Sequence, residues 1–313
     1  MNFKNTSVKE NSKTFLPKYT ICICNYNMGD TLKRSLLSIL DQVDNDYEIL
    51  IVDDGSNDNS IDVIKNIMVN HSNLRLIRLK RNKDRGLGIT RNISIKEAKG
   101  KYVILHIDAD DLWEPYIKTF VYLFHKLENL VKKDFLLSGE QINIGKKTLL
   151  LKYGPYRNLN RSEDRDMWHR LAAKNLYIPV KHIPFRKRMK RKSSINVMRV
   201  FRNTWCQLIY EFRRTNSNLL VLFNVFKAPF IINKNFSLSL KILRIIYALP
   251  ALFKSNHYED LTFPRSMPNP EDFLKYRKKV IGTFPELFKR YGYDFNILDL
   301  KEDEIRIFNN IKI

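Results

Sequence analysis

Cysteine and long apolar runs are both scarce in this chain of 313 residues. The three cysteines give no disulfide framework. Cys22 and Cys24 lie two positions apart in an apolar run and are interpreted as small core residues rather than a metal-binding pair. No run reaches the ~18 uncharged apolar residues that a membrane-spanning helix needs. Residues 1–17 are polar, lack the apolar core of a signal peptide and are predicted to form a tail. A cytoplasmic protein is therefore expected.

Acidic residues are also few: the chain has 33 Asp and Glu against 55 Lys and Arg, which gives a formal net charge of +22. Such a charge favours anionic partners. The excess is concentrated between residues 165 and 214, which hold 14 Lys and Arg but 2 Asp and Glu, and include "KHIPFRKRMKRK" at 181–192. Two interpretations stay open for this run: a solvated surface, or a contact with phosphates or membrane headgroups. Its segment "RKRMKRK" at 186–192 carries no interleaved aromatics for stacking on single-stranded nucleic acid, which is not an expected partner.

Short apolar runs alternate with segments of helical periodicity. Strands are predicted at 19–27, 47–56, 74–82 and 101–111, with helices at 31–42, 60–71, 88–100 and 114–130. Two further apolar runs flank "GKK" at 145–147, which predicts a hairpin there. This alternation is typical of an α/β protein with a mostly parallel sheet and helices on both faces. The sequence thus predicts a Rossmann-like architecture.

Polar clusters follow three of the predicted strands: "CNYN", "VDDGSNDNS" and "DADD". Ligands of open parallel sheets bind beyond the carboxyl ends of the strands, so these clusters are expected to converge. Asp108 and Asp110 can both approach one cation if the chain turns at Ala109, and a divalent ion would relieve their repulsion. Ligation by oxygen alone suits Mg²⁺ or Mn²⁺, which commonly also binds substrate phosphate. The sequence therefore predicts a metal that holds a diphosphate.

Two other clusters carry both structural and functional interpretations. Turn formation explains Gly55 and Ser56, but leaves the adjacent carboxylates of Asp53 and Asp54 without a role. Asp54 is therefore a candidate acceptor for a base N–H or a ribose hydroxyl. In "RGLGITRN" at 85–92, two glycines before a helix are expected to let the backbone approach a ligand, with Arg91 as a phosphate partner.

The segment "SEDRDMWHRL" at 162–171 is typical of a helix start. Ser162 can cap it, and Glu163 and Asp164 fall in the first turn, where the helix dipole lowers a carboxylate pKa. Asp164 and Trp168 are four apart and share a face, as a base and an aromatic platform for a sugar hydroxyl would. The other interpretation, which this stretch by itself favours, is helix-start acids with a core tryptophan. His169 in the same stretch is predicted to lie at the surface.

The C-terminal part contains an amphipathic basic helix at 237–254. Its apolar face carries six large side chains: Leu238, Ile242, Ile245, Ile246, Leu249 and Phe253. The favoured interpretation is a helix packed on the core. The alternative is a helix lying in the plane of a membrane surface, which the neighbouring basic run supports.

Taken together, "CNYN", "VDDGSNDNS", "GLGITRN", "DADD" and "SEDRDMW" resemble the family 2 inverting glycosyltransferases of GT-A fold, over about residues 18–175. Cys24 stands where that family commonly has proline. The resemblance implies a role for each matching residue. Tyr26 and Asp54 would hold the nucleotide base, Arg91 would lie near the ribose and diphosphate, and Asp108 would contact the ribose. Asp110, or instead Asp111, would bind the metal. Asp164, beside Glu163 and Trp168, would be the general base.

The resulting hypothesis is a metal-dependent enzyme that transfers a hexosyl or N-acetylhexosaminyl group, with inversion, in glycan or polysaccharide assembly. Mn²⁺ or Mg²⁺, a UDP-sugar donor and a glycan or lipid-linked acceptor are expected. Residues 18–180 would form the catalytic domain. A mainly helical region at 181–313 would contact the acceptor or the inner face of the membrane. The alternatives are a nucleotidyltransferase and a basic nucleic-acid-binding protein, whose affinity would fall steeply with salt.

Overall fold

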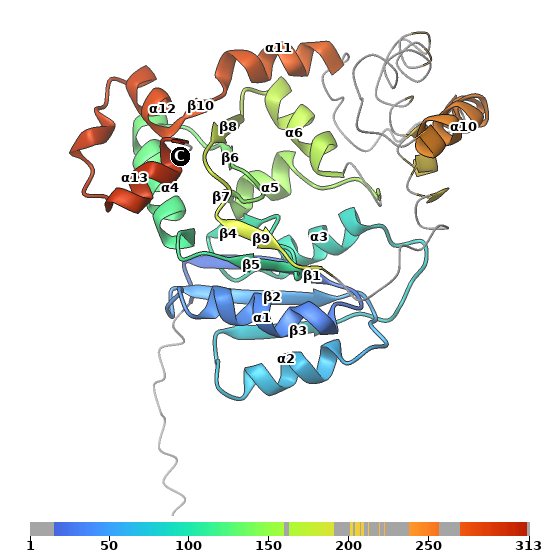
Figure 1. Ribbon diagram of the computed structural model, residues 1–313, viewed down its shortest axis with the longest axis horizontal. Helices are drawn as coiled ribbons and strands as arrows, with labels where there is room; N and C mark the ends of the chain where they lie inside the picture. The colour runs from blue at the N-terminus through green and yellow to red at the C-terminus, as the bar shows by residue number, and fades with distance from the viewer. Residues whose placement is uncertain are drawn as a thin grey trace, which may run out of the picture.

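The computed structural model describes residues 16–159, 163–190, 238–256 and 270–311, with scattered residues between 201 and 222. Its N-terminal half alternates strands and helices as the periodicity predicts (Figure 1). These elements are β1 (Tyr19–Asn25), α1 (Gly29–Leu40), β2 (Tyr47–Asp53), α2 (Ser60–Met68), β3 (Leu74–Arg78), α3 (Leu87–Glu97) and β4 (Tyr102–Leu105). The predicted tail lies outside the described residues, apart from its last two positions.

The middle of the chain adds shorter elements. They are β5 (Asp111–Trp113), α4 (Ile117–Val131), β6 (Leu136–Ser138), β7 (Asn143–Lys146), α5 (Lys147–Tyr153), α6 (Glu163–Ala173), β8 (Tyr177–Lys181) and β9 (Arg186–Arg188). The hairpin predicted around "GKK" is wrong in position. The antiparallel pair is β6 with β7, whereas "KTLLLKY" forms helix α5. Leu149 and Leu150 of this helix are buried, and periodicity over so short an apolar run does not separate helix from strand.

The main sheet has the strand order β10-β8-β6-β7-β4-β1-β2-β3 among the described residues, where β10 spans Gly282–Thr283. All neighbouring pairs are parallel except those of β7, which runs antiparallel to β4 and to β6. Parallel order places the carboxyl ends of β1, β2 and β4 along one edge. A mostly parallel α/β sheet is confirmed, and this edge positions the candidate site.

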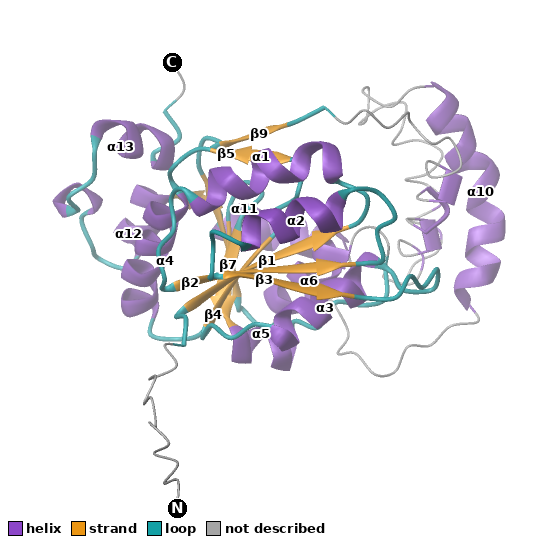
Figure 2. Ribbon diagram, turned by 90° about the horizontal axis from the view of Figure 1, so that it is seen from below, coloured by secondary structure: helices purple, strands orange, loops and turns teal. Residues whose placement is uncertain are grey.

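Helices cover both faces of the sheet, as Figure 2 shows for α1 and α2 on one side and α3 and α5 on the other. Alternating side chains of β1 enter two separate cores, because successive residues of a strand point to opposite faces. Ile21 and Ile23 pack in the cluster that contains Leu36 and Phe120, while Cys22 packs with residues of α3, α5 and α6. Burial on both faces explains why these strands are apolar almost throughout.

Segments beyond residue 180 also pack on this sheet. Strand β10 pairs with β8, and α12 (Phe284–Arg290) and α13 (Glu302–Phe308) bury Phe284, Phe288 and Phe308 in the larger core. Helix α11 (Pro270–Val280) contributes Phe273 to the other core. The described C-terminal elements are mainly helical, as expected. The boundary near residue 180 stays a prediction.

Helix α10 (Leu238–Asn256) differs from the expected packing. Its inward side is formed by Ala248 and Ala251, which bury against Leu208 and Phe212 in a small separate cluster. Most of the predicted apolar face is instead exposed, at 48–68% of each residue, for Leu238, Ile242, Ile246, Leu249 and Phe253. The favoured interpretation of that face was therefore wrong. Within the described part of the chain, no helix is both long and apolar enough to cross a membrane.

Candidate active site

The polar clusters after β1, β2 and β4 converge at the carboxyl edge of the sheet, as predicted. Asn25 at the end of β1 donates from its amide to Asp53 at the end of β2, over 2.7 Å. Asp53 also accepts from the Ser56 hydroxyl and from the backbone N–H groups of Gly55 and Ser56. The buried Asp53 therefore stabilises the turn after β2 by accepting these hydrogen bonds, which gives this aspartate a structural role that the sequence did not show. Gly55 adopts φ +77°, the left-handed conformation that glycine accepts most readily.

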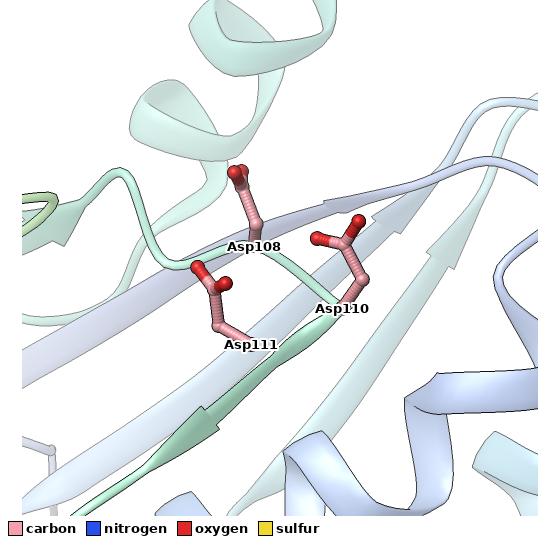
Figure 3. Close-up of side chains that lie close together, drawn as sticks. All are labelled: Asp108, Asp110 and Asp111. Carbon is pink, nitrogen blue, oxygen red and sulfur yellow. The ribbon is translucent and has the colours of Figure 1, made fainter. Parts of the chain in front are cut away.

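The acidic strand end forms a compact carboxylate cluster. Strand β4 stops at Leu105, and the chain turns at His106, which has φ +67°. Helix α1 fixes the turn, because the hydroxyls of Thr31 and Ser35 donate to the backbone carbonyls at positions 109 and 108. Ligand oxygens of Asp108, Asp110 and Asp111, which we call the Asp triad, lie within 4.8 Å of one another. Figure 3 shows their side chains projecting from the same side of the loop.

The Asp triad fits a hard divalent cation. All its ligand atoms are carboxylate oxygens, which suit Mg²⁺ and Mn²⁺. Asp111 is fully buried, and its Oδ2 has no hydrogen-bond partner among the described residues. Burial raises the pKa of Asp111 even though Arg188 and Arg186 act against it. A buried carboxylate oxygen without a partner is costly and is satisfied when a cation binds it.

Two arginines that were not predicted from the sequence form ion pairs with the Asp triad. Arg186 donates to Asp111 Oδ1 over 2.8 Å, and Arg188 contacts all three carboxylates. Both belong to the basic run at 181–192, for which only solvent, phosphate or headgroup contacts were considered. The alternation in "RKR" of β9 was the available signal, since it places Arg186 and Arg188 on one face and Lys187 on the other.

The proposed nucleoside end of the site lies beyond β2 and β3. Tyr26 is 42% exposed, and the Arg81 guanidinium lies 4.4 Å from the centre of its ring. Both Asp54 oxygens are engaged, by Arg81 over 2.5 Å and by Arg85 Nε over 2.6 Å. Asp54 therefore offers a base no unoccupied carboxylate oxygen in this conformation. Its direct contact with the nucleotide stays a prediction, and Arg81 becomes an additional candidate.

Arg91 is the centre of a buried polar group. It lines a cavity of about 210 Å³ together with Cys24, His106 and Asp108. Its guanidinium donates to His106 Nε2 over 2.9 Å and lies 3.4 Å from Glu163 Oε1. Burial raises the pKa of Glu163, although Arg91 lowers it. The expectation that the first helical turn would lower a carboxylate pKa is thus wrong for Glu163, because its burial outweighs the helix dipole.

Asp164 behaves differently. Its carboxylate accepts from the Arg165 backbone N–H over 2.8 Å and lies 3.8 Å from His106 Nδ1. Burial raises the pKa of Asp164, but His106, Arg91 and the Arg165 N–H outweigh burial and hold this pKa below its usual range. A carboxylate that stays ionised at neutral pH and is partly exposed can accept a proton from a substrate.

His106 was not recognised from the sequence. It is buried between Arg91, Tyr156 and Trp168, and burial together with the Arg91 charge lowers its pKa to about 3. The imidazole is therefore neutral at pH 7. Since Nε2 accepts from Arg91, the single ring proton is assigned to Nδ1, which faces Asp164. A histidine after an apolar strand gave no distinguishing signal, because most such residues are packing residues.

Two aromatic residues of α6, Trp168 and His169, pack against other rings. Trp168 stacks on His106 and on Tyr177, with ring centres 5.6 and 5.9 Å apart, so packing occupies much of its surface. Its role as a sugar platform stays a prediction. His169 was predicted to lie at the surface, but it is buried and stacks on Phe273 of α11 at 4.0 Å. The predicted cap, Ser162, lies outside the described residues.

A buried ion-pair network fixes α6. Asp166 is fully buried and accepts from Arg170 over 2.9 Å and from Arg157 over 3.0 Å.

The two glycines of "RGLGITRN" were expected to let a ligand approach the backbone, but the segment 157–159 of the protein itself lies against them. A Cβ at Gly88 would lie 2.0 Å from the Arg157 carbonyl oxygen. Gly86 and Gly88 therefore admit residues 157–159 beside α3, and no ligand is needed to explain them.

Comparison with known proteins agrees with this architecture. The family model described as "Glycosyl transferase family 2" matches residues 20–197. The Escherichia coli protein "UDP-Glc:alpha-D-GlcNAc-diphosphoundecaprenol beta-1,3-glucosyltransferase WfaP" is 27% identical over 183 residues, which cover 50% of this chain and 71% of that protein. The Borreliella burgdorferi "Cholesterol galactosyltransferase" is 31% identical over 135 residues, 42% of this chain and 37% of that protein.

Among solved structures, Staphylococcus aureus TarS 1–349 in complex with UDP-GlcNAc superposes with a TM-score of 0.53 at 16% identity, over 76% of this chain and 81% of that one. At this identity the likeness shows the fold alone. Several curated relatives are matched over only about a third of their length, such as 37% and 32%. The family model, by contrast, covers more than half of the chain. The protein therefore belongs to glycosyl transferase family 2 and is a glycosyltransferase.

Proposed function

We propose that the protein transfers a hexosyl or N-acetylhexosaminyl group from a nucleoside-diphosphate sugar to an acceptor hydroxyl, with inversion at the anomeric carbon. The observation that carries the proposal is that the ionised carboxylate of Asp164 faces His106, two residues before the Asp triad at the end of β4. One base and one charge-neutralising site suffice for a single in-line displacement. Family membership separates the protein from the two alternatives, nucleotidyl transfer and nucleic-acid binding without catalysis.

Asp164 would take the proton of the acceptor hydroxyl as the acceptor's oxygen attacks the anomeric carbon. The His106 Nδ1–H faces this carboxylate across 3.8 Å, and the half-buried Arg91 donates a hydrogen bond to the other ring nitrogen of His106. Arg91, anchored by Glu163, would also face the donor's ribose and diphosphate from the cavity that it shares with Asp108. Trp168 would border the sugar through its packing on His106.

The Asp triad would hold Mn²⁺ or Mg²⁺, with Asp110 or Asp111 as the principal ligand and Asp108 directed to the ribose. Such an ion supplies charge neutralisation for the leaving diphosphate. The nucleoside would lie over Tyr26, with Arg81 and Asp54 at its edge. UDP is the favoured nucleotide, since the WfaP relative is named for UDP-Glc and its match covers half of this chain.

A lipid-linked or glycan acceptor at the inner face of a membrane is proposed for the same reason, because that relative is named for a diphosphoundecaprenol acceptor. The exposed apolar residues of α10 give this proposal a physical basis. At 100° per residue, Leu238, Ile242, Ile246, Leu249 and Phe253 fall within an arc of about 80°. An apolar stripe of that kind on a strongly basic chain suits an anionic membrane surface.

The function is tested with Asp164→Asn, which keeps the size of the side chain but removes its basicity. We expect turnover to fall by about 10³-fold or more, with donor affinity nearly unchanged. Asp62→Asn, an exposed carboxylate on α2, serves as the matched control. Release of nucleoside diphosphate by the wild type, and a product of inverted anomeric configuration by NMR, complete the test. Release of pyrophosphate, or undiminished turnover in Asp164→Asn, would contradict the proposal.

A further inference from the structure

One guanidinium occupies the space between the three carboxylates of the Asp triad. Nη2 of Arg188 lies 2.9 Å from Asp108 Oδ2, Nη1 lies 2.5 Å from Asp110 Oδ1, and Nε lies 2.9 Å from Asp111 Oδ1. All three nitrogens of one side chain therefore contact the triad, each at one of the two oxygens of a different carboxylate. Arg188 and a divalent ion would neutralise the same three carboxylates at close range, and two cations held together repel each other, so Arg188 and the metal compete for the Asp triad.

The backbone fixes this arrangement. Strand β9 pairs antiparallel with β5 in a two-stranded sheet of their own, with Arg188 opposite Asp111 and Arg186 opposite Trp113. The Met189 N–H donates to the Asp110 carbonyl over 2.8 Å, which extends the pairing by one residue. The register of β9 on β5 therefore places Arg188 beside the Asp triad. The Arg188 side chain is nevertheless 42% exposed, so it can leave the carboxylates without unpacking the core.

The net charge of the Asp triad and its two arginines indicates how the site would respond to a divalent ion. The three carboxylates formally exceed the guanidiniums of Arg186 and Arg188 by one negative charge, so adding a dication would leave the cluster positive. Displacing Arg188 restores balance, but a guanidinium released beside a newly bound cation needs an anion of its own. A diphosphate provides one, because its oxygens match the fork of an arginine.

We propose that Arg188 is the resident counter-cation of the Asp triad, that a divalent metal must displace it, and that a nucleoside diphosphate promotes this exchange by binding the released guanidinium. This inference rests on the proposed function, and it assigns Arg188 as a positioning residue that couples the metal to the donor. Metal alone then binds weakly. Metal and nucleotide bind cooperatively, and each raises the affinity for the other by the same factor.

The experiment measures Mn²⁺ affinity on the full chain, by calorimetry and by the EPR signal of free Mn²⁺, with and without UDP. Arg188→Gln removes the competing charge. Lys187→Gln is the matched control, because Lys187 precedes Arg188 in β9, is exposed, and points away from the Asp triad. Arg188→Lys provides a second variant, since one ammonium bridges three carboxylates less well than a guanidinium. Circular dichroism checks that each variant is folded.

We expect Arg188→Gln to bind Mn²⁺ about ten-fold or more tightly than the wild type in the absence of nucleotide, with Arg188→Lys between the two and Lys187→Gln unchanged. The gain in Mn²⁺ affinity produced by UDP should shrink in Arg188→Gln. Equal or weaker Mn²⁺ binding by Arg188→Gln would overturn the proposal. A wild type that transfers sugar without binding Mn²⁺ would overturn it too, while leaving the proposed function intact.

Discussion

His106 Nδ1 lies 3.8 Å from Asp164 Oδ2, and the opposite ring nitrogen of His106 accepts from Arg91. One neutral imidazole therefore lies between the proposed base on α6 and a guanidinium on α3. Such a ring directs the base without competing with it for protons. His106 is thus placed to control the orientation of Asp164.

Two substitutions of His106 distinguish the role of its Nδ1, which faces Asp164, from that of its Nε2, which accepts from Arg91. Asparagine places an N–H near the position of Nδ1 and tolerates the positive φ of this residue, whereas glutamine reaches only the position of Nε2. We expect His106→Asn to keep most of the turnover and His106→Gln to lose about ten-fold or more, because only the first keeps an N–H that faces Asp164. Steady-state kinetics measure both. Equal losses in the two variants would assign His106 to packing.

The pH profile should lack a histidine limb. Since the pKa of His106 is lowered to about 3, the ring does not titrate near its ordinary 6.5. The pKa of Asp164 is also lowered from 3.8, so the base is ionised above that value and protonates only as the pH falls further. We expect kcat to show no loss attributable to either group between about pH 5 and 8. An acid limb near 6.5 that disappears in His106→Asn would contradict this.

Substitution of Gly55 is expected to destabilise the protein, through backbone strain and through a steric clash. Gly292 shares only the backbone strain, so comparing the two glycines separates these effects. Gly55 has φ +77°, and a Cβ there would lie 2.6 Å from the Arg81 backbone nitrogen. Gly292 has φ +72°, but a Cβ at that position would have no atom of the described residues within 4 Å. Both alanine variants should lose about 1 kcal/mol from backbone strain. Gly55→Ala should lose more, and should also weaken UDP binding by shifting Arg81. Urea unfolding and calorimetry measure these effects.

The apolar stripe of α10 predicts membrane binding that depends on both apolar area and charge. Replacing Ile246 and Phe253 by aspartate should abolish co-sedimentation with anionic liposomes, because it removes buried area and adds repulsion. Val69→Asp is the control, since Val69 is 82% exposed at the end of α2, away from this stripe. Binding should also weaken with salt. A wild type that leaves anionic liposomes unbound at low salt would end this proposal.

Sequence periodicity determined much of the architecture. The near-continuous apolar runs of β1, β2 and β4 follow from burial on both faces, and this is why a parallel sheet was predictable. The position of polar residues after each run determined the edge where the site would form. The Asp triad was a candidate from its position after a buried strand. Acidic residues are common in a first helical turn, so Asp164 was singled out by the family resemblance.

Tertiary structure alone decided the partners of these groups. Arg188 is 78 positions from Asp110 and 80 from Asp108 in the chain, and it reaches them only through the pairing of β9 with β5. His106 and Asp164 meet because α6 packs beside the end of β4. Burial and the Arg91 charge lower the pKa of His106, whereas the neighbours of Asp164 lower its pKa against the effect of burial. Local sequence fixes which side chains can carry charge. Burial and long-range pairing, which involve residues far apart in the chain, determine which charges are balanced and which remain available for chemistry.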